Sequence, residues 1–295
     1  EPLFANPQSM VLYPVHALLR AIPIDRVFAV DIWFHIWLTV VAVYLMLRDF
    51  GLSRTASAGA AVSAGFSTMV TVRAVVGHMD QLPVLPWALL ASMTYRWYLR
   101  KGSVWQLYLT VLMTTLVMVS GHTQCSLTGL LIPGSCFVYE TLACGSARRF
   151  LTMLARTACV GVISLGVLAV QLLPTIEYFT QTTRVEGFSL EASVVYALDP
   201  ARFLSVLTPF LPMELGGRAW GYQETTMYST LMAVGWVAIA WRSPLRKHAR
   251  FVRYLLIVSL LTVVLSMGTL TPLYGLLYKL LPFFRAPGRF LILWS

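Results

Sequence analysis

The chain has 295 residues, of which 58% are hydrophobic and only 12% are charged, and its formal net charge is +10. A soluble globular protein carries about 25% charged residues, and one core cannot hide this much apolar surface from water. The composition therefore excludes an ordinary soluble domain and predicts an all-α polytopic membrane protein. It also argues against a nucleic-acid partner, because the sequence shows no solvated basic face.

Apolar segments of the length that a spanning helix needs recur along the chain. We expect eight spans within one transmembrane domain covering residues 1–295, and a ninth that begins at Arg289. The eight are Phe28–Leu47, Ala56–Val72, Leu82–Trp97, Val104–Ser120, Ser126–Ala143, Thr152–Leu173, Thr225–Trp241 and Phe251–Met267. The third span is short and carries Pro83 and Pro86, which predict a bent or partly re-entrant outer end.

Basic residues gather in alternate loops and their margins, and this pattern predicts the orientation. Thirteen of the 22 Lys and Arg residues lie there: Arg48, Arg54, Arg96, Arg100, Lys101, Arg148, Arg149, Arg156, Arg242, Arg246, Lys247, Arg250 and Arg253. Because Lys and Arg are retained on the cytoplasmic side, we expect a multi-pass membrane protein with these loops in the cytoplasm.

Two longer segments are expected on the opposite, extracytoplasmic side. The loop over 174–224 is apolar and marked by Pro, Gly and Trp, which predicts a folded cap. Within 269–288, "TPLYGLLYKLLPFF" has helical apolar spacing but is too short and interrupted to span, so we expect a helix lying in the interface. The chain starts at Glu1 without a signal peptide and ends inside an apolar run, so we interpret it as an internal fragment of a longer protein.

Asp31 and His35 lie four residues apart near the outer end of the first span, and therefore on one helical face. Ionisable residues at membrane depth are costly and are functional candidates. Two interpretations are equally open: an interhelical hydrogen-bonded pair that fixes the bundle, or the lining of a polar cavity.

Two polar groups occur at outer helix ends and offer potential acid, base or phosphate-binding side chains. "RAVVGHMDQLP" carries His78 and Asp80, and "VSGHTQ" carries His122 and Gln124. A lone histidine is more often structural, and these spacings match no metal motif. Two such groups at equal depth are more informative, because side chains from different hairpins would approach one layer.

Further candidates follow in the long outer loop. "VQLLPTIEYFTQTTRVEG" contains Glu177 and Arg184, and "GYQETTMY" contains Glu224 where the seventh span begins. A carboxylate at a helix N-terminus also complements the helix dipole, so we weigh a structural and a functional role for Glu224 equally. Outer acidic residues could bind a divalent cation, but their spacing specifies no metal, and no cofactor is assigned.

The last candidate site is "LPFFRAPGRFLILW", where Arg285 and Arg289 flank a proline–glycine turn. Arginine keeps its charge and binds phosphate oxygens through a bidentate fork. Backbone N–H groups of a helix beginning near Arg289 would add positive potential. These features favour binding of a lipid-linked phosphate, with Arg184 as a further candidate ligand. The alternative is two snorkelling anchors that meet lipid headgroups.

The chain resembles the bacterial YfhO-like membrane proteins over almost its whole length. The likeness is carried, in the family's order, by "EPLFANPQSMVLYP", "GHMDQLPVLPWALL", "SGHTQ", "QLLPTIEYFTQTTR", "YQETTMY" and "GTLTPLYGLLYKLLPFFRAPGRFL". That family is similar to the GT-C class of membrane glycosyltransferases. The resemblance implies a GT-C-like bundle in the bacterial cytoplasmic membrane that transfers a sugar from a polyprenyl-phosphate donor to a cell-envelope polymer, lipid or protein on the extracytoplasmic face. The candidate sugar- or acceptor-binding residues are then His78, Asp80, His122, Gln124, Glu177 and Glu224.

The resemblance also implies a carboxylate, acting as base or metal ligand, in the first extracytoplasmic loop. We expect it before residue 1, so neither Asp25 nor Asp31 is assigned as the catalytic base. Two rival functions remain: a transporter or flippase for lipid or polysaccharide, and a non-catalytic membrane assembly protein. A transporter should have polar or unwound segments near the midplane, often in symmetric halves, and the sequence shows no such symmetry.

Overall fold

The computed structural model describes residues 4–182, 187–202, 249–282 and 284–293, and the regular secondary structure within these ranges is entirely helical. Four helices in this part of the chain are long and apolar enough to cross a membrane: Ile24–Asp49, Arg54–Val75, Ala147–Thr180 and Ala249–Ser266. The protein is therefore a helical membrane protein, as its composition predicts. The chain divides into two compact units, which we describe separately: unit 1 is Glu1–Ser57 with Met79–Gln181, and unit 2 is Ala58–His78 with Thr182–Ser295.

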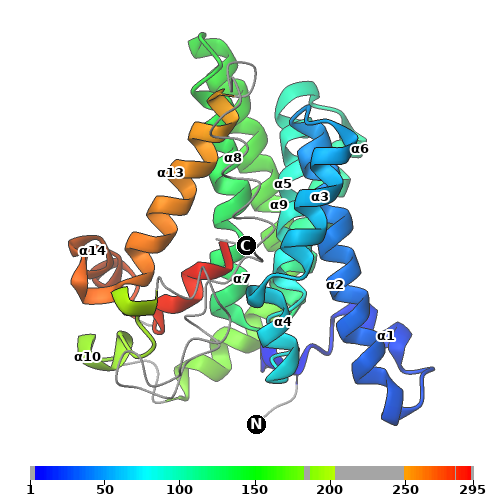
Figure 1. The fold of residues 1–295 in the computed structure, drawn as a ribbon, viewed down its shortest axis with the longest axis vertical. Coiled ribbons are helices and arrows are strands. Elements are labelled where there is room, and N and C mark those ends of the chain that lie inside the picture. The colour runs from blue at the N-terminus through cyan, green and yellow to red at the C-terminus, as the bar shows by residue number, and fades with distance from the viewer. Residues whose placement is uncertain (1–3, 183–186, 203–248, 283, 294–295) are drawn as a thin grey trace. The chain divides into compact units, whose positions relative to one another are not determined.

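Unit 1 is a bundle whose helices run alongside one another around α5 (Figure 1). Its helices are α1 (Pro14–Leu19), α2 (Ile24–Asp49), α5 (Val84–Lys101), α6 (Val104–Val119), α7 (Thr123–Gly129), α8 (Leu131–Thr141) and α9 (Ala147–Thr180). Helix α5 packs against α2, α6 and α8, and most of its residues are buried. This central position explains why α5 is less apolar than the candidate spans, since helices rather than lipid cover it.

The prolines of the third predicted span begin a helix rather than bend one. Pro83 is the residue that precedes α5, and Pro86 is its third residue. The first N–H groups of a helix have no carbonyl partner within the helix, so a proline there sacrifices no hydrogen bond. The expected bend or re-entrant segment is therefore absent from Val84–Lys101.

Two predicted spans are interrupted. The segment Ser126–Ala143 forms α7 and α8, which meet at Leu130. Pro133, in the first turn of α8, cannot continue the hydrogen-bonding pattern of α7. Residues Ala56–Val72 fall on α3 (Arg54–Gly65), which continues from unit 1 into unit 2, and α4 (Thr68–Val75).

Helix α9 extends beyond its predicted end. The sequence pattern ends this span at Leu173, but α9 continues through Pro174 to Thr180. The Gln171 amide lies in this turn, where it donates to Thr175 Oγ1 at 3.2 Å and to the Phe4 carbonyl at 2.8 Å. The first residues of the predicted 174–224 loop are thus helical.

Unit 2 contains shorter helices around one long helix. Its helices, besides α4, are α10 (Leu190–Ser193), α13 (Ala249–Ser266), η5 (Gly268–Leu270), α14 (Pro272–Leu280) and η6 (Pro287–Leu293). Helix α13 packs against η6 and α14. Helix α14 confirms that "TPLYGLLYKLLPFF" contains a helix, with Tyr274 buried and Leu276 and Leu280 exposed.

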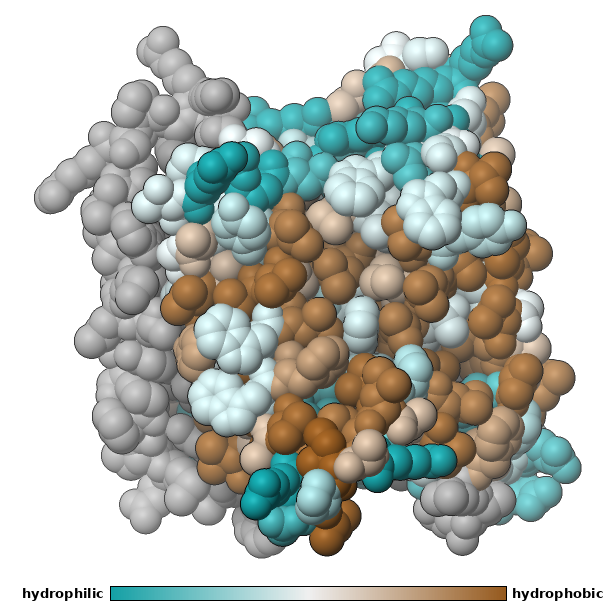
Figure 2. Space-filling model, turned by 90° about the vertical axis from the view of Figure 1, so that its right-hand side faces the viewer, coloured by the Kyte–Doolittle hydropathy of each residue, from teal (hydrophilic) through white to brown (hydrophobic). Residues whose placement is uncertain are grey.

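The surface is apolar where lipid would cover it. On the face shown in Figure 2, hydrophobic side chains form a broad band between hydrophilic groups at the two ends. Large apolar side chains are also exposed along α2: Phe28, Trp33, Phe34, Trp37, Val41 and Leu45. Every predicted span within the described residues contains helix, while Thr225–Trp241 lies outside them. The expected total of eight or nine spans stays a prediction.

Candidate functional site

Asp80 and His122, which the sequence places on two different hairpins, lie side by side in unit 1. The His122 backbone N–H donates to the Asp80 carbonyl at 3.0 Å. Gly121 permits this approach, because its φ is +127° and a Cβ there would lie 2.8 Å from the Asp80 Cβ. Such contact distances are sterically forbidden to an L side chain, so only glycine fits. The loop before α5 is thereby joined to the α6–α7 turn.

One hydrogen bond indicates which nitrogen of the His122 ring is an acceptor. His122 precedes α7, and its Nδ1 accepts the Cys125 backbone N–H at 3.3 Å. Because Nδ1 is an acceptor here, the proton of the neutral ring is on Nε2. Asp80, His122 and Gln124 are all partly exposed. A carboxylate, an imidazole N–H and an amide offer both acceptors and donors, as recognition of sugar hydroxyls requires.

The structure does not bring the other predicted sugar- or acceptor-binding residues into this contact. His78 belongs to unit 2, where its backbone N–H donates to the Arg73 carbonyl at 2.9 Å. Glu177 is exposed on α9, one turn before that helix ends. Arg184 and Glu224 lie outside the described residues.

Arg285 and Arg289 are both in unit 2, but their surroundings differ. Arg285 is exposed, and its guanidinium carbon is 5.3 Å from the centroid of the Phe188 ring. Arg289 is only 8% exposed. The two predicted phosphate ligands therefore differ in accessibility. Arg285 is accessible, whereas Arg289 is buried, because the turn between them directs the chain inward.

The backbone N–H groups of this turn, which the sequence predicts to add positive potential, are engaged in hydrogen bonds within unit 2. The Ala286 N–H donates to the Ser193 carbonyl at 2.9 Å, and the Gly288 N–H donates to the Tyr196 carbonyl at 3.0 Å. The Arg289 N–H donates to the Ala286 carbonyl at 3.0 Å. These bonds hold the turn rigid, with Ala286 at a φ of +56°. These three N–H groups are therefore not the donors that a phosphate would use, and the Arg285 side chain is the accessible one.

A buried polar cluster lies deeper in unit 1, and it consists of Tyr13, His16, Asp31, His35 and Trp87. Asp31 and His35, on α2, are 3% and 1% exposed. The Tyr13 hydroxyl is 2.6 Å from His35 Nε2 and accepts the Trp87 Nε1–H at 2.7 Å. On the other side, His16 Nε2 is 3.3 Å from Asp31 Oδ2. The cluster thus joins the segment before α2 to both α2 and α5.

The distances in this cluster fit one tautomer of His35. His35 Nδ1 lies 2.8 Å from the Asp31 backbone carbonyl and 3.2 Å from Asp31 Oδ1, and with the proton of a neutral ring on Nδ1, Nε2 accepts from the Tyr13 hydroxyl. The Tyr13 oxygen remains free to accept from Trp87. Burial raises the pKa of Tyr13, so its hydroxyl keeps the proton that this arrangement requires.

The cluster decides between the two interpretations of Asp31 and His35. Both side chains are buried, and they contact Tyr13 and His16 from the segment before α2. This agrees with the first interpretation, in which hydrogen bonds between elements fix the bundle. Sequence spacing identified these two but missed Tyr13, His16 and Trp87, because their partners are 15 to 74 residues away along the chain. The side chain of His16 is 33% exposed, so the cluster reaches solvent at this residue.

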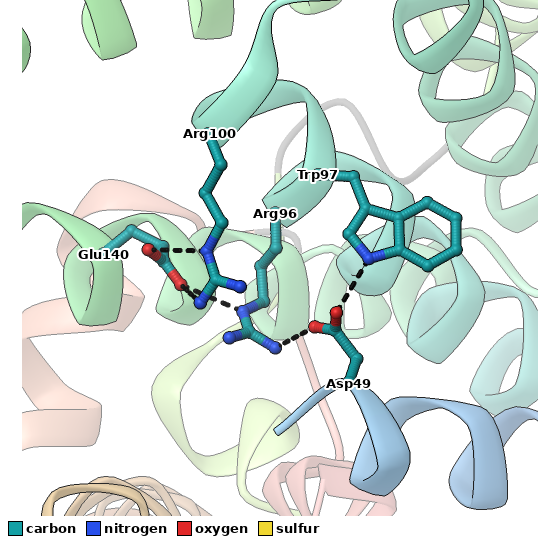
Figure 3. A network of polar contacts seen from close by, with 5 residues as sticks. All are labelled: Asp49, Arg96, Trp97, Arg100 and Glu140. Atoms are coloured by element: carbon teal, nitrogen blue, oxygen red, sulfur yellow. Dashed lines mark hydrogen bonds and ion pairs between the residues drawn. The ribbon is translucent and has the colours of Figure 1, made fainter. Parts of the chain in front are cut away.

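A second buried network connects the C-terminal ends of α2, α5 and α8 (Figure 3). Arg96 pairs with Asp49 and, through Nε, with Glu140 at 3.1 Å. Glu140 also accepts from Arg100 at 2.7 and 3.2 Å, and Trp97 donates to Asp49 at 2.7 Å. The Arg96 guanidinium lies 3.5 Å from the centroid of the Phe50 ring.

This network corrects the simple count of basic loop residues. Arg96 is 1% exposed, so it is an internal residue rather than a loop charge. Two arginines are balanced by two carboxylates, and only the remaining basic residues contribute to a charge difference between the two sides. The expected orientation rests on those residues.

No family model, curated protein or solved structure matches the chain. The assignment of a function therefore depends on the residues and contacts described above. The likeness to YfhO-like proteins stays a hypothesis drawn from sequence motifs.

Proposed function

We propose that the chain belongs to a membrane glycosyltransferase of the GT-C type, similar to the YfhO-like proteins. It would transfer a sugar from a polyprenyl-phosphate donor to a cell-envelope acceptor on the extracytoplasmic face. The observation that carries this proposal is the contact between Asp80 and His122. The backbones of these two predicted sugar-binding residues, which come from different hairpins, meet there, and this contact brings the loops that carry both side chains together.

The reaction is a displacement at the anomeric carbon of the donor sugar. An acceptor hydroxyl loses its proton to a carboxylate, which the resemblance places outside this chain, and its oxygen forms the new glycosidic bond. The bond between the anomeric carbon and the phosphate oxygen breaks, and polyprenyl phosphate leaves as an anion. A nearby cation stabilises this developing charge.

The residues of this chain have separate roles in that reaction. Asp80, His122 and Gln124 hold sugar hydroxyls, with Glu177, Glu224 and His78 as further candidates. Arg285, with Arg289 and Arg184 as its proposed partners, binds the donor phosphate. Arg285 is the best supported of the three, because its guanidinium is exposed and is held beside Phe188 on a rigid turn.

Sugar transfer in membranes that contain the full-length protein tests the proposal. We expect Asp80→Asn and His122→Ala each to reduce transfer from a radiolabelled polyprenyl-phosphate sugar by on the order of 100-fold. Gly121→Ala should reduce it as well, since the added Cβ forces the Asp80 loop away from His122.

Two matched substitutions serve as controls. Asp25→Asn removes an exposed carboxylate from the start of α2, and Gly134→Ala adds a methyl group where nothing lies within 4 Å. Both should leave transfer unchanged. Transfer that persists in the Asp80 and His122 variants would refute their role. Movement of the intact lipid-linked sugar across the membrane without transfer would favour a flippase instead.

A further inference from the structure

A strongly basic pocket lies at the end of α5 that is remote from Asp80. Its volume is about 350 Å³, and it opens between the last turn of α5 and the first turns of α9. Four arginines line it together with two hydroxyl groups: Arg100, Arg148, Arg149, Arg156, Ser146 and Thr152. No carboxylate is among its lining residues, so its walls are positively charged.

One wall of the pocket is a fixed guanidinium group. Arg156 donates to the Leu99 carbonyl at 2.7 Å and to the Tyr98 carbonyl at 3.2 Å, so it caps the C-terminal end of α5. Gly102 follows α5 with a φ of +72°, and a Cβ there would lie 2.1 Å from an Arg156 nitrogen. The chain thus leaves α5 without a side chain that would displace Arg156.

The opposite wall is the first turn of α9. Arg148 and Arg149 are the second and third residues of this helix, and both are exposed. Within the described residues, neither guanidinium group has a hydrogen bond or an ion pair. The Ser146 side chain does not cap the helix, so the positive end of the helix dipole adds to these charges.

Arg100 also lines the pocket, and Glu140 holds its guanidinium group in place. Both oxygens of Glu140 accept hydrogen bonds from Arg100, and this carboxylate is shared with Arg96. Glu140 therefore neutralises the network of Figure 3 and leaves Arg148, Arg149 and Arg156 without a carboxylate partner. An anion with several acceptor oxygens, such as a phosphate group, matches this arrangement.

The surface beside the pocket indicates where that phosphate comes from. Helix α9 is a candidate membrane span, and the sequence predicts that its apolar part begins at Thr152, so we expect its first turn at a membrane boundary. The large apolar side chains of Phe150, Leu151 and Leu154 are exposed immediately after the two free arginines. We propose that the pocket binds the phosphate headgroup of an anionic membrane lipid, whose acyl chains lie along this apolar surface of α9.

Native mass spectrometry of the purified protein in detergent tests this site. Phosphatidic acid is titrated against the protein, with phosphatidylcholine of the same acyl chains as the zwitterionic comparison. We expect the double variant Arg148→Ala/Arg149→Ala to weaken phosphatidic acid binding by about tenfold. The double variant Arg54→Ala/Arg253→Ala removes the same charge from exposed positions elsewhere, and its affinity should equal that of the unmodified protein.

Three results would overturn the proposal. The first is an equal loss of binding in both double variants, which would indicate a general charge effect. The second is unchanged binding in the Arg148/Arg149 variant when circular dichroism shows the same helical content. The third is displacement of phosphatidic acid by millimolar inorganic phosphate, which would identify a soluble phosphate as the ligand. None of these results bears on the sugar-transfer proposal, which rests in unit 1 on Asp80 and His122, beyond the N-terminal end of α5.

Discussion

Replacing Arg96 with alanine should lower the free energy of unfolding by about 3–5 kcal/mol, the largest stability effect that we expect. The substitution leaves the nearly buried carboxylate of Asp49 without its cation, and it removes one of the two arginines that bind Glu140. It also removes the guanidinium that packs on Phe50. Unfolding of the detergent-solubilised protein, followed by circular dichroism, measures this change.

Two comparisons separate the network from a general effect of charge removal. Arg54→Ala deletes an exposed cation and should change stability by less than about 0.5 kcal/mol. Arg96→Lys keeps the charge but cannot reach both carboxylates with a planar fork, so it should fall between the two alanine variants. If Arg96→Ala were no less stable than Arg54→Ala, the network of Figure 3 would not hold α2, α5 and α8 together.

The second large effect is expected at His35. His35→Ala should destabilise the protein by about 2–4 kcal/mol, because it leaves a cavity and removes the acceptor of the Tyr13 hydroxyl. The same thermal unfolding measurement reports this loss. Cleavage by a protease within residues 10–22 should also become faster, since Tyr13 helps to hold this segment against α2 and α5.

Trp33→Ala is the matched control for this prediction. Trp33 is on the same helix, two residues from His35, but its side chain is 52% exposed. Its removal should therefore cost far less than the removal of His35. Equal losses in the two variants would mean that the buried cluster contributes no more than an exposed aromatic group.

The positions of the helices could be predicted because apolar run length is a local property of the sequence. The predicted span Val104–Ser120 and helix α6 (Val104–Val119) differ by one residue. The prediction was wrong where a proline was involved. Pro83 and Pro86 begin α5, whereas Pro174 lies within α9. The effect of a proline depends on its distance from the helix start, which the surrounding packing determines.

Polar contacts could be predicted only where both partners are near in sequence. Asp31 and His35 were paired by their spacing of four residues, but the Arg96 network required α8 to dock on α5. Arg96 and Glu140 are 44 residues apart, so no pattern connects them. The same limit applies to the candidate site. Asp80 and His122 were each recognised, but their contact depends on the conformation of Gly121.

Sugar transfer by an Arg285→Ala variant is the most direct test of the proposed function, because this exposed guanidinium is the best-supported ligand of the donor phosphate. Membranes with the variant and with Arg253→Ala, an exposed arginine on α13, would receive the same radiolabelled polyprenyl-phosphate sugar. We expect Arg285→Ala to reduce transfer by on the order of 100-fold and Arg253→Ala to leave it unchanged. Equal transfer by both variants would contradict a donor phosphate held at Arg285.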